Sequence, residues 1–208
     1  MSGWLKRIAS SARTSLLLVG LCVGAARAAT TVALTGDALA AAQAEAQTAL
    51  APLADGKPTV ESKQVFEVGD GHARVRIVPV RYSPRVRGPL ANVDACALAI
   101  TDANRPIVTV QTIGVGYTET VGCTGLDSIA FPDLDGDRRF EIALIYSTIT
   151  PPNRYGKMPV VLRRGAGGAF IVDEALGAAL DARGGITTIA GLRAAAAQLT
   201  STHHDATK

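Results

Sequence analysis

Short segments in which apolar and polar residues alternate recur along this chain, and glycine- or proline-containing turns separate them. The clearest pair, 95–100 and 107–113, flanks a turn at 101–106, and Cys96, Leu98 and Ile100 share one face. A period of two is typical of half-buried strands, and a short turn between two of them makes an antiparallel hairpin. Further strands are predicted at 65–68, 73–82, 140–150, 160–162 and 170–172. The predicted fold is therefore mainly β (α+β), an antiparallel sheet or sandwich with short flanking helices.

The segment 73–82 changes its alternation midway. Val75 and Ile77 are apolar in one register, Val78 and Val80 in the other, and Pro79 lies between them. Because proline has no N–H to donate to a neighbouring strand, we expect an edge strand or a bulge at this point.

Helices are predicted on both sides of the β-rich region. An alanine-rich helix is expected at 37–50 with Asp37 as its N-cap, and two more at 174–182 and 190–199, the last capped by Thr188. The chain then divides into a signal segment at 1–28, a helical N-terminal segment at 29–57, a single β-rich domain at 58–200 and a frayed tail at 201–208.

The first 28 residues have the features of a cleavable export signal. Basic residues precede an apolar stretch at 16–24, and Ala26-Arg27-Ala28 supplies the small-residue pattern of a cleavage site. The stretch is much shorter than the roughly 20 residues needed to span a bilayer. We expect a periplasmic or secreted protein cleaved after Ala28, with no membrane span afterwards. A lipid anchor on Cys22 and an uncleaved anchor are the alternatives.

Removal of this signal changes the charge of the chain. The full sequence has 21 Lys and Arg against 18 Asp and Glu, a formal charge of +3. The signal contains four of the basic residues and no acid, so 17 remain against 18, a charge of −1. The overall charge therefore gives no support for a nucleic-acid partner. Five arginines still gather between Arg74 and Arg87, either as a patch for an anionic partner or as a solvated strand face.

Cys96 and Cys123 are the two cysteines that remain after signal removal. An even pair in an exported protein predicts a structural disulfide. A redox pair or a metal site are the alternatives, but the sequence contains no C-x-x-C and no histidine close to either cysteine.

One acidic loop contains a pattern with chemical meaning. Residues 133–141, Asp-Leu-Asp-Gly-Asp-Arg-Arg-Phe-Glu, place carboxylates at positions 1, 3, 5 and 9 and a backbone carbonyl, that of Arg139, at position 7. Hard cations such as Ca²⁺ take six to eight oxygen ligands at about 2.3–2.6 Å. The alternative is an acidic turn whose charges are offset by Arg138 and Arg139.

The loop and its strand context resemble a known pattern. With a hairpin before it and the strand "EIALIYST" after it, the loop resembles the D-x-[DN]-x-D-G-x-x-[DE] loops of FG-GAP/VCBS-type and periplasmic proteins, and the calcium-loop region of periplasmic lysozyme-inhibitor-like proteins of the i-type class. The resemblance covers roughly 95–172. It implies a periplasmic β domain with bound calcium, whose ligands are Asp133, Asp135, Asp137, the Arg139 carbonyl and Glu141.

The chain departs from this pattern in two places. Arg138 stands where the family loop usually has glycine, and a non-glycine residue in the left-handed conformation costs about 1 kcal/mol or more. The S-G-x-x-Y inhibitory loop is absent, since the only Ser-Gly pair is Ser2-Gly3. Lysozyme inhibition is therefore the less supported part of the resemblance.

No familiar catalytic motif occurs. The sequence lacks G-x-S-x-G, H-E-x-x-H and a P-loop, and His72 is expected to be a surface histidine. Tyr155, next to Arg154 in a long loop predicted at 151–157, either forms a binding hot spot or packs its ring on the sheet.

We therefore expect an exported, non-catalytic protein that binds a protein or a cell-envelope glycan. Calcium would hold the acidic loop, and the loop would position the neighbouring 151–157 loop as a contact surface. The alternatives are an envelope hydrolase that uses acidic-loop carboxylates and a purely structural domain.

Overall fold

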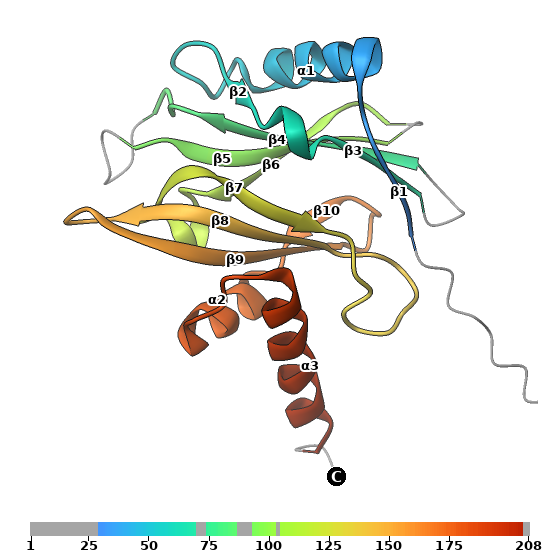
Figure 1. Ribbon diagram of the computed structural model, residues 1–208, viewed down its shortest axis with the longest axis vertical. Helices are drawn as coiled ribbons and strands as arrows, with labels where there is room; N and C mark the ends of the chain where they lie inside the picture. Colours follow the sequence, from blue (N-terminus) through green and yellow to red (C-terminus); the bar gives the residue numbers. More distant parts are fainter. Residues whose placement is uncertain (1–28, 70–73, 87–92, 103–104, 206–208) are drawn as a thin grey trace, which may run out of the picture.

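The structure is a computed structural model that describes residues 29–69, 74–86, 93–102 and 105–205. Its elements stack in four layers, with one helix, a six-stranded sheet, a four-stranded sheet and two further helices in succession (Figure 1). All strand pairs are antiparallel. The predicted mainly β fold with short flanking helices is confirmed, in its sandwich form. The signal segment, His72 and Arg87 lie outside the described residues.

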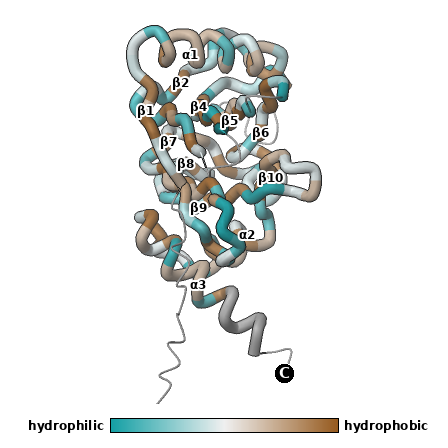
Figure 2. The backbone as a smooth tube through the Cα atoms, turned by 90° about the vertical axis from the view of Figure 1, so that its right-hand side faces the viewer, coloured by the Kyte–Doolittle hydropathy of each residue, from teal (hydrophilic) through white to brown (hydrophobic). Residues whose placement is uncertain are grey.

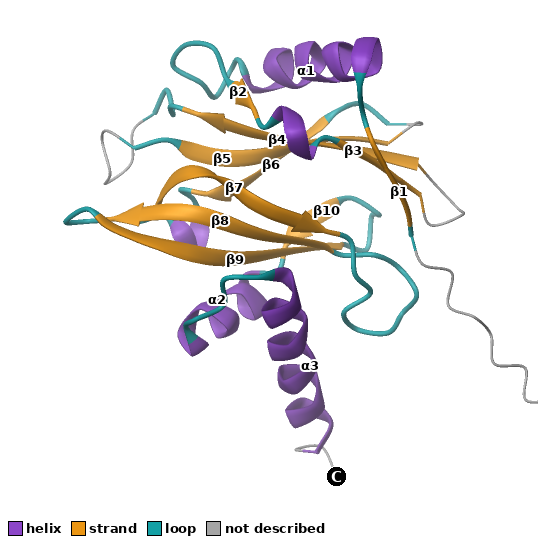
Figure 3. Cartoon of the chain, viewed as in Figure 1, coloured by secondary structure: helices purple, strands orange, loops and turns teal. Residues whose placement is uncertain are grey.

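Figure 3 shows the secondary structure of both sheets. The first has the order β1-β3-β4-β5-β6, with β2 beside β4, and consists of β1 (Thr30–Ala33), β2 (Thr59–Val60), β3 (Phe66–Gly69), β4 (Arg74–Tyr82), β5 (Ala95–Asp102) and β6 (Val108–Ile113). The second has the order β10-β9-β8-β7 and consists of β7 (Gly122–Ala130), β8 (Ile142–Thr150), β9 (Arg154–Arg164) and β10 (Phe170–Val172). The helices are α1 (Gly36–Leu50), α2 (Glu174–Arg183) and α3 (Ile189–Asp205), with 3₁₀ turns η1 (Ser62–Gln64) and η2 (Gly116–Thr118).

Three apolar cores separate the four layers, and apolar residues concentrate along the strands of both sheets (Figure 2). The core between the sheets includes Ile77, Leu98, Leu144, Val160 and Leu162. The core between the second sheet and helices α2 and α3 includes Ala143, Ile145, Val161, Leu180 and Leu192. Residues 143–145 of β8 alternate between these two cores, so this strand is buried on both faces.

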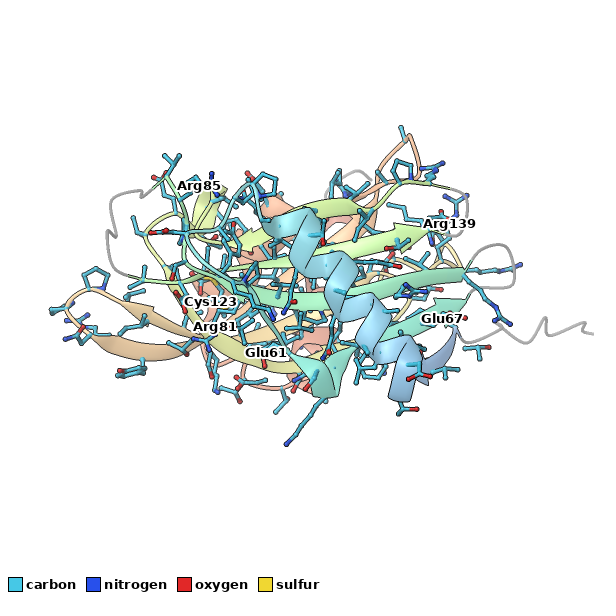
Figure 4. All side chains as sticks on the ribbon, turned by 90° about the horizontal axis from the view of Figure 1, so that it is seen from above. Glu61, Glu67, Arg81, Arg85, Cys123 and Arg139 are labelled. Atoms are coloured by element: carbon cyan, nitrogen blue, oxygen red, sulfur yellow. A yellow bond between two sulfur atoms is a disulfide. The ribbon has the colours of Figure 1, made fainter. Side chains whose placement is uncertain are left out.

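Helix α1 crosses the outer face of the first sheet (Figure 4). Its buried residues Ala42, Ala46 and Leu50 are four apart and therefore form one stripe along the helix. They pack with alanines of β5, among them Ala97 and Ala99, so that small side chains meet from both surfaces. This contact explains why a helix with so thin an apolar face is stable on the sheet.

The edge strand or bulge expected at Pro79 is wrong. Strand β4 is internal, pairs with β5 over its length from Val75 to Tyr82, and shows no register shift. Its two apolar registers face two different cores, since Ile77 belongs to the inter-sheet core and Val78 to the α1 core. The carbonyl of Pro79 accepts the Glu61 N–H at 3.0 Å, so its nitrogen faces the gap between β3 and β2, where no donor is required.

Other elements agree only in part with the predictions made from the sequence. Strand β1 precedes α1, whose N-cap is Thr35 rather than Asp37. Strand β7 (Gly122–Ala130) lies in a segment where the sequence predicts no strand. The predicted cap of α3 is confirmed, because the Gly191 N–H donates to Thr188 Oγ1 at 3.1 Å. That helix continues to Asp205, into the predicted frayed tail.

The predicted disulfide is confirmed, and it joins the two sheets. Cys96 lies on β5 and Cys123 on β7, and both are almost fully buried in the inter-sheet core. The bond therefore links the two halves of the sandwich across the core that holds them together.

We expect the double variant Cys96→Ala/Cys123→Ala to lose about 3–4 kcal/mol of unfolding free energy, because the bond restricts the unfolded chain. Urea denaturation of the oxidised protein and the variant measures the difference. The protein after reduction should match the variant. Equal unfolding free energies for all three would contradict this stabilising role.

Candidate functional site

The acidic loop connects β7 to β8 at one end of the sandwich. Figure 4 labels Arg139 of this loop and Cys123, which lie toward opposite ends of the sandwich. The base of the loop is closed by Phe131 and Phe140, whose rings meet edge to face at 5.9 Å, and by the Glu141 N–H, which donates to the Pro132 carbonyl at 2.8 Å. Both rings pack in the inter-sheet core, so the loop starts and ends on a rigid base.

Aspartate side chains organise the backbone inside the loop. Asp133 accepts from the backbone N–H of Gly136 at 2.7 Å and of Arg138 at 3.1 Å. Asp135 accepts from the Asp137 N–H at 3.0 Å. Short side chains that hydrogen-bond to the backbone a few residues on are typical of tight turns. The loop shape is therefore held by its own carboxylates.

Arg138 adopts the left-handed conformation, with φ of 70°, as does Gly136 with φ of 83°. Glycine is usual at this position in the calcium loops that the acidic loop resembles, and the positive φ of Arg138 is the strained conformation that glycine would relieve. The hydrogen bond to Asp133 contributes to holding Arg138 in this conformation.

Three of the predicted ligands come together. Asp133, Asp135 and Glu141 each offer a carboxylate oxygen, and these oxygens lie within 4.8 Å of one another. Asp137 is not in this group, and its Oδ1 accepts from the Arg139 N–H at 2.8 Å. The role of the Arg139 carbonyl as a calcium ligand stays a prediction.

Glu141 differs from the two aspartates because it is buried. Only 6% of the residue is exposed, and its Oε2 accepts from the Leu134 N–H at 2.6 Å. The pKa of the Glu141 carboxyl is raised from 4.5 to about 7, mainly by burial and also by the charges of the nearby aspartates, while the hydrogen bond from Leu134 acts in the opposite direction; the aspartates are Asp135, Asp137 and Asp133. Among the described residues, no lysine or arginine forms an ion pair with the three clustered carboxylates. The group is thus a concentrated negative charge with a buried member.

The arginine stretch makes its contacts within the chain. Arg74 pairs with Glu67 at 3.0 Å, Arg76 with Glu45 of α1 at 2.9 Å and Arg81 with Asp94 at 3.0 Å. Arg85 donates to backbone carbonyls of Ala51 and Ala54. These contacts favour the interpretation as a strand face over that of a patch for an anionic partner.

Tyr155 and Arg154 begin strand β9, and the long loop predicted at 151–157 is wrong. Residues 151–153 form the whole turn, since Thr150 pairs with Arg154 across the hairpin. Tyr155 is 77% exposed, which excludes the alternative in which its ring packs on the sheet. The predicted influence of the acidic loop on this segment is also wrong, because the loop and the turn lie at opposite ends of β8.

No family model, no curated protein and no solved structure matches this chain. The resemblance of the acidic loop to calcium-loop proteins therefore stays a prediction. None of the helices in the described part of the chain has the length and apolarity needed to cross a membrane.

The raised pKa of Glu141 predicts how stability depends on pH when divalent cations are removed. A folded-state pKa of about 7 above the unfolded value of 4.5 means that the stabilising effect is complete below pH 4.5 and is lost as the pH rises through 7. This loss is at most roughly 3.5 kcal/mol, since the pKa differs by about 2.5 units and one unit corresponds to about 1.4 kcal/mol.

Urea denaturation in chelator between pH 4.5 and 8 measures this effect, with Glu141→Gln as the matched variant that removes the titrating group. The variant should show a flatter pH dependence and exceed the unchanged protein in stability above pH 7. Parallel curves for the two proteins would contradict the assignment.

Proposed function

We propose that this chain is an exported, non-catalytic binding protein in which Ca²⁺ occupies the acidic loop. The observation that carries the proposal is the convergence of Asp133, Asp135 and Glu141, with one carboxylate buried and no basic partner among the described residues. Burying a charged carboxylate is unfavourable unless a counter-charge compensates it. A divalent cation supplies that compensation.

The ligand chemistry favours calcium. All three groups offer carboxylate oxygens, the ligands of hard cations, and no cysteine or histidine belongs to the cluster. Calcium also tolerates irregular and flexible coordination, whereas magnesium requires near-ideal octahedral geometry. The Asp137 side chain and the Arg139 carbonyl complete the proposed ligand set.

Export and partner form the second part of the proposal. The signal-like segment at 1–28 supports export to the periplasm or beyond, and the disulfide is compatible with an oxidising compartment. The proposed partner is a protein or a cell-envelope glycan, contacted by Tyr155 and Arg154 at the β8–β9 turn. Inhibition of a lysozyme is one specific form of this binding.

Addition of Ca²⁺ to the purified, chelator-treated protein should raise its melting temperature by roughly 5–10 °C when free Ca²⁺ is about 100 times the dissociation constant. Calorimetric titration measures the affinity directly. Glu141→Gln and Asp135→Asn should each weaken Ca²⁺ binding by roughly tenfold or more, because each removes a charged ligand. Asp181→Asn, an exposed carboxylate on α2, is the matched control and should bind Ca²⁺ unchanged.

Two results would replace this proposal. An unchanged melting temperature with Ca²⁺ and with chelator would remove calcium from it. Hydrolysis of peptidoglycan by the purified protein, lost in Glu141→Gln, would instead establish the rival function of an envelope hydrolase. The rival has a physical basis, since a buried carboxyl with a raised pKa beside a second carboxyl is an arrangement suited to general acid catalysis.

If lysozyme is the partner, the purified protein should inhibit an i-type lysozyme, and Tyr155→Ala should weaken inhibition by about tenfold or more, as expected for an exposed aromatic contact at the centre of an interface. Ile171→Ala, which shortens an exposed apolar side chain on β10, is the control and should inhibit as the unchanged protein does. Equal inhibition by the unchanged protein and Tyr155→Ala would exclude the hairpin as the contact surface.

A further inference from the structure

A cavity of about 390 Å³ lies between β9, helices α2 and α3, and the acidic loop. Figure 1 shows the two helices below the second sheet, on the side toward which the loop projects. Most of the wall is apolar and comes from Leu134, Val161, Leu176, Ala179, Ala196 and Leu199. Small-molecule sites in proteins are typically concave, mostly apolar and about 300–1,000 Å³ in volume. The cavity therefore has the size and lining of a site for an apolar small molecule.

The polar part of the wall is the acidic cluster. Asp135 and Glu141 line the cavity, together with Arg163 and Asp173. The latter two neutralise each other, since Arg163 Nε lies 3.4 Å from Asp173 Oδ2. The two remaining carboxylates of the wall, Asp135 and Glu141, are proposed calcium ligands, and a cation held by them borders the cavity.

The net charge around the cavity determines which polar group a bound molecule could place next to the acidic loop. Two smaller hollows adjoin the acidic loop, one beside Arg139 and Arg164 and one beside Arg193 of α3. Together with the loop and the cavity, their described residues include five carboxylates and five guanidinium groups, so the region is close to neutral without a metal: Asp133, Asp135, Asp137, Glu141 and Asp173, against Arg138, Arg139, Arg163, Arg164 and Arg193. A bound Ca²⁺ makes the region positive by two charges. The five proposed protein ligands, with one oxygen each, leave calcium short of its six to eight oxygen ligands, so an oxygen anion from a bound molecule can complete the coordination.

We propose that the cavity binds the apolar chain of a carboxylate amphiphile, of the medium-chain fatty acid type, whose carboxylate binds the Ca²⁺ in the acidic loop. This inference rests on the proposed calcium site. Apolar burial against α2, α3 and β9 supplies binding free energy, and the metal selects an anionic head. An ammonium head is repelled by the metal-loaded region, and a hydroxyl head carries no compensating charge.

Calorimetric titration of the purified protein with decanoate, below its micellar concentration, tests the inference. With saturating Ca²⁺ we expect decanoate to bind at least tenfold more tightly than decanol or decylammonium, and at least tenfold more tightly than decanoate binds in chelator. Equal decanoate affinity with Ca²⁺ and with chelator would overturn the role of the metal. Equal affinity for decanol would overturn the role of the carboxylate.

Two neighbouring alanines of α2 provide matched variants. Ala179 is half-buried and lines the cavity, whereas Ala178 is exposed and is not part of the wall. Ala179→Phe should reduce decanoate affinity tenfold or more while Ca²⁺ affinity stays within twofold, and Ala178→Phe should change neither. Ala175→Phe, at an exposed position of the same wall, repeats the test if Ala179→Phe unfolds the protein.

The outcomes separate this inference from the function on which it rests. Calcium binding without any decanoate binding overturns the inference alone. Absence of calcium binding overturns both. Decanoate binding that survives in Ala179→Phe and Ala175→Phe places the ligand outside the cavity and also overturns the inference.

Discussion

Burial of strands on both faces is the constraint on which the rest of this structure depends. In β4, β5, β8 and β9 successive apolar residues point to opposite sides, so each sheet has two faces that water would solvate poorly. One face of each sheet is covered by the other sheet. The second face requires a helix, and α1 and the α2–α3 pair fill these places. The four-layer arrangement follows from the sequence of these strands rather than from the helices, whose own apolar faces are thin.

This constraint explains which elements could be predicted from the sequence. Strands β3, β5, β6, β8 and β10 have regular patterns, and their positions were predicted to within a few residues. The position of strand β4 was also predicted. Its two apolar registers, however, indicated an edge strand or a bulge at Pro79, because a strand buried on one face has a single apolar register. Its double burial depends on α1, which is remote in the sequence and could not be anticipated from the local pattern.

Strand β7 shows a different limit. Its pairing with β8 shifts register between Cys123 and Gly125 and again between Leu126 and Ser128, so its residues do not alternate regularly between faces. Irregular register removes the period-two signal on which a strand prediction relies. The disulfide could still be predicted, because cysteine count and export require no knowledge of the strands.

For the acidic loop, the spacing of the carboxylates predicted that they converge, but it did not predict that Glu141 is the buried one or that Asp137 lies outside the cluster.

The position of Glu141 links the loop chemistry to the packing of the whole molecule. It follows Phe140, whose ring belongs to the inter-sheet core, and its carboxylate accepts from the amide of Leu134, whose side chain packs against the core beneath α2 and α3. The loop is therefore attached to two of the three cores, one on each face of the second sheet. A charge change at Glu141 therefore acts on a backbone segment that both cores hold. A cation at this carboxylate would strengthen the same attachment, because it replaces the unfavourable burial of a lone negative charge by a compensated one.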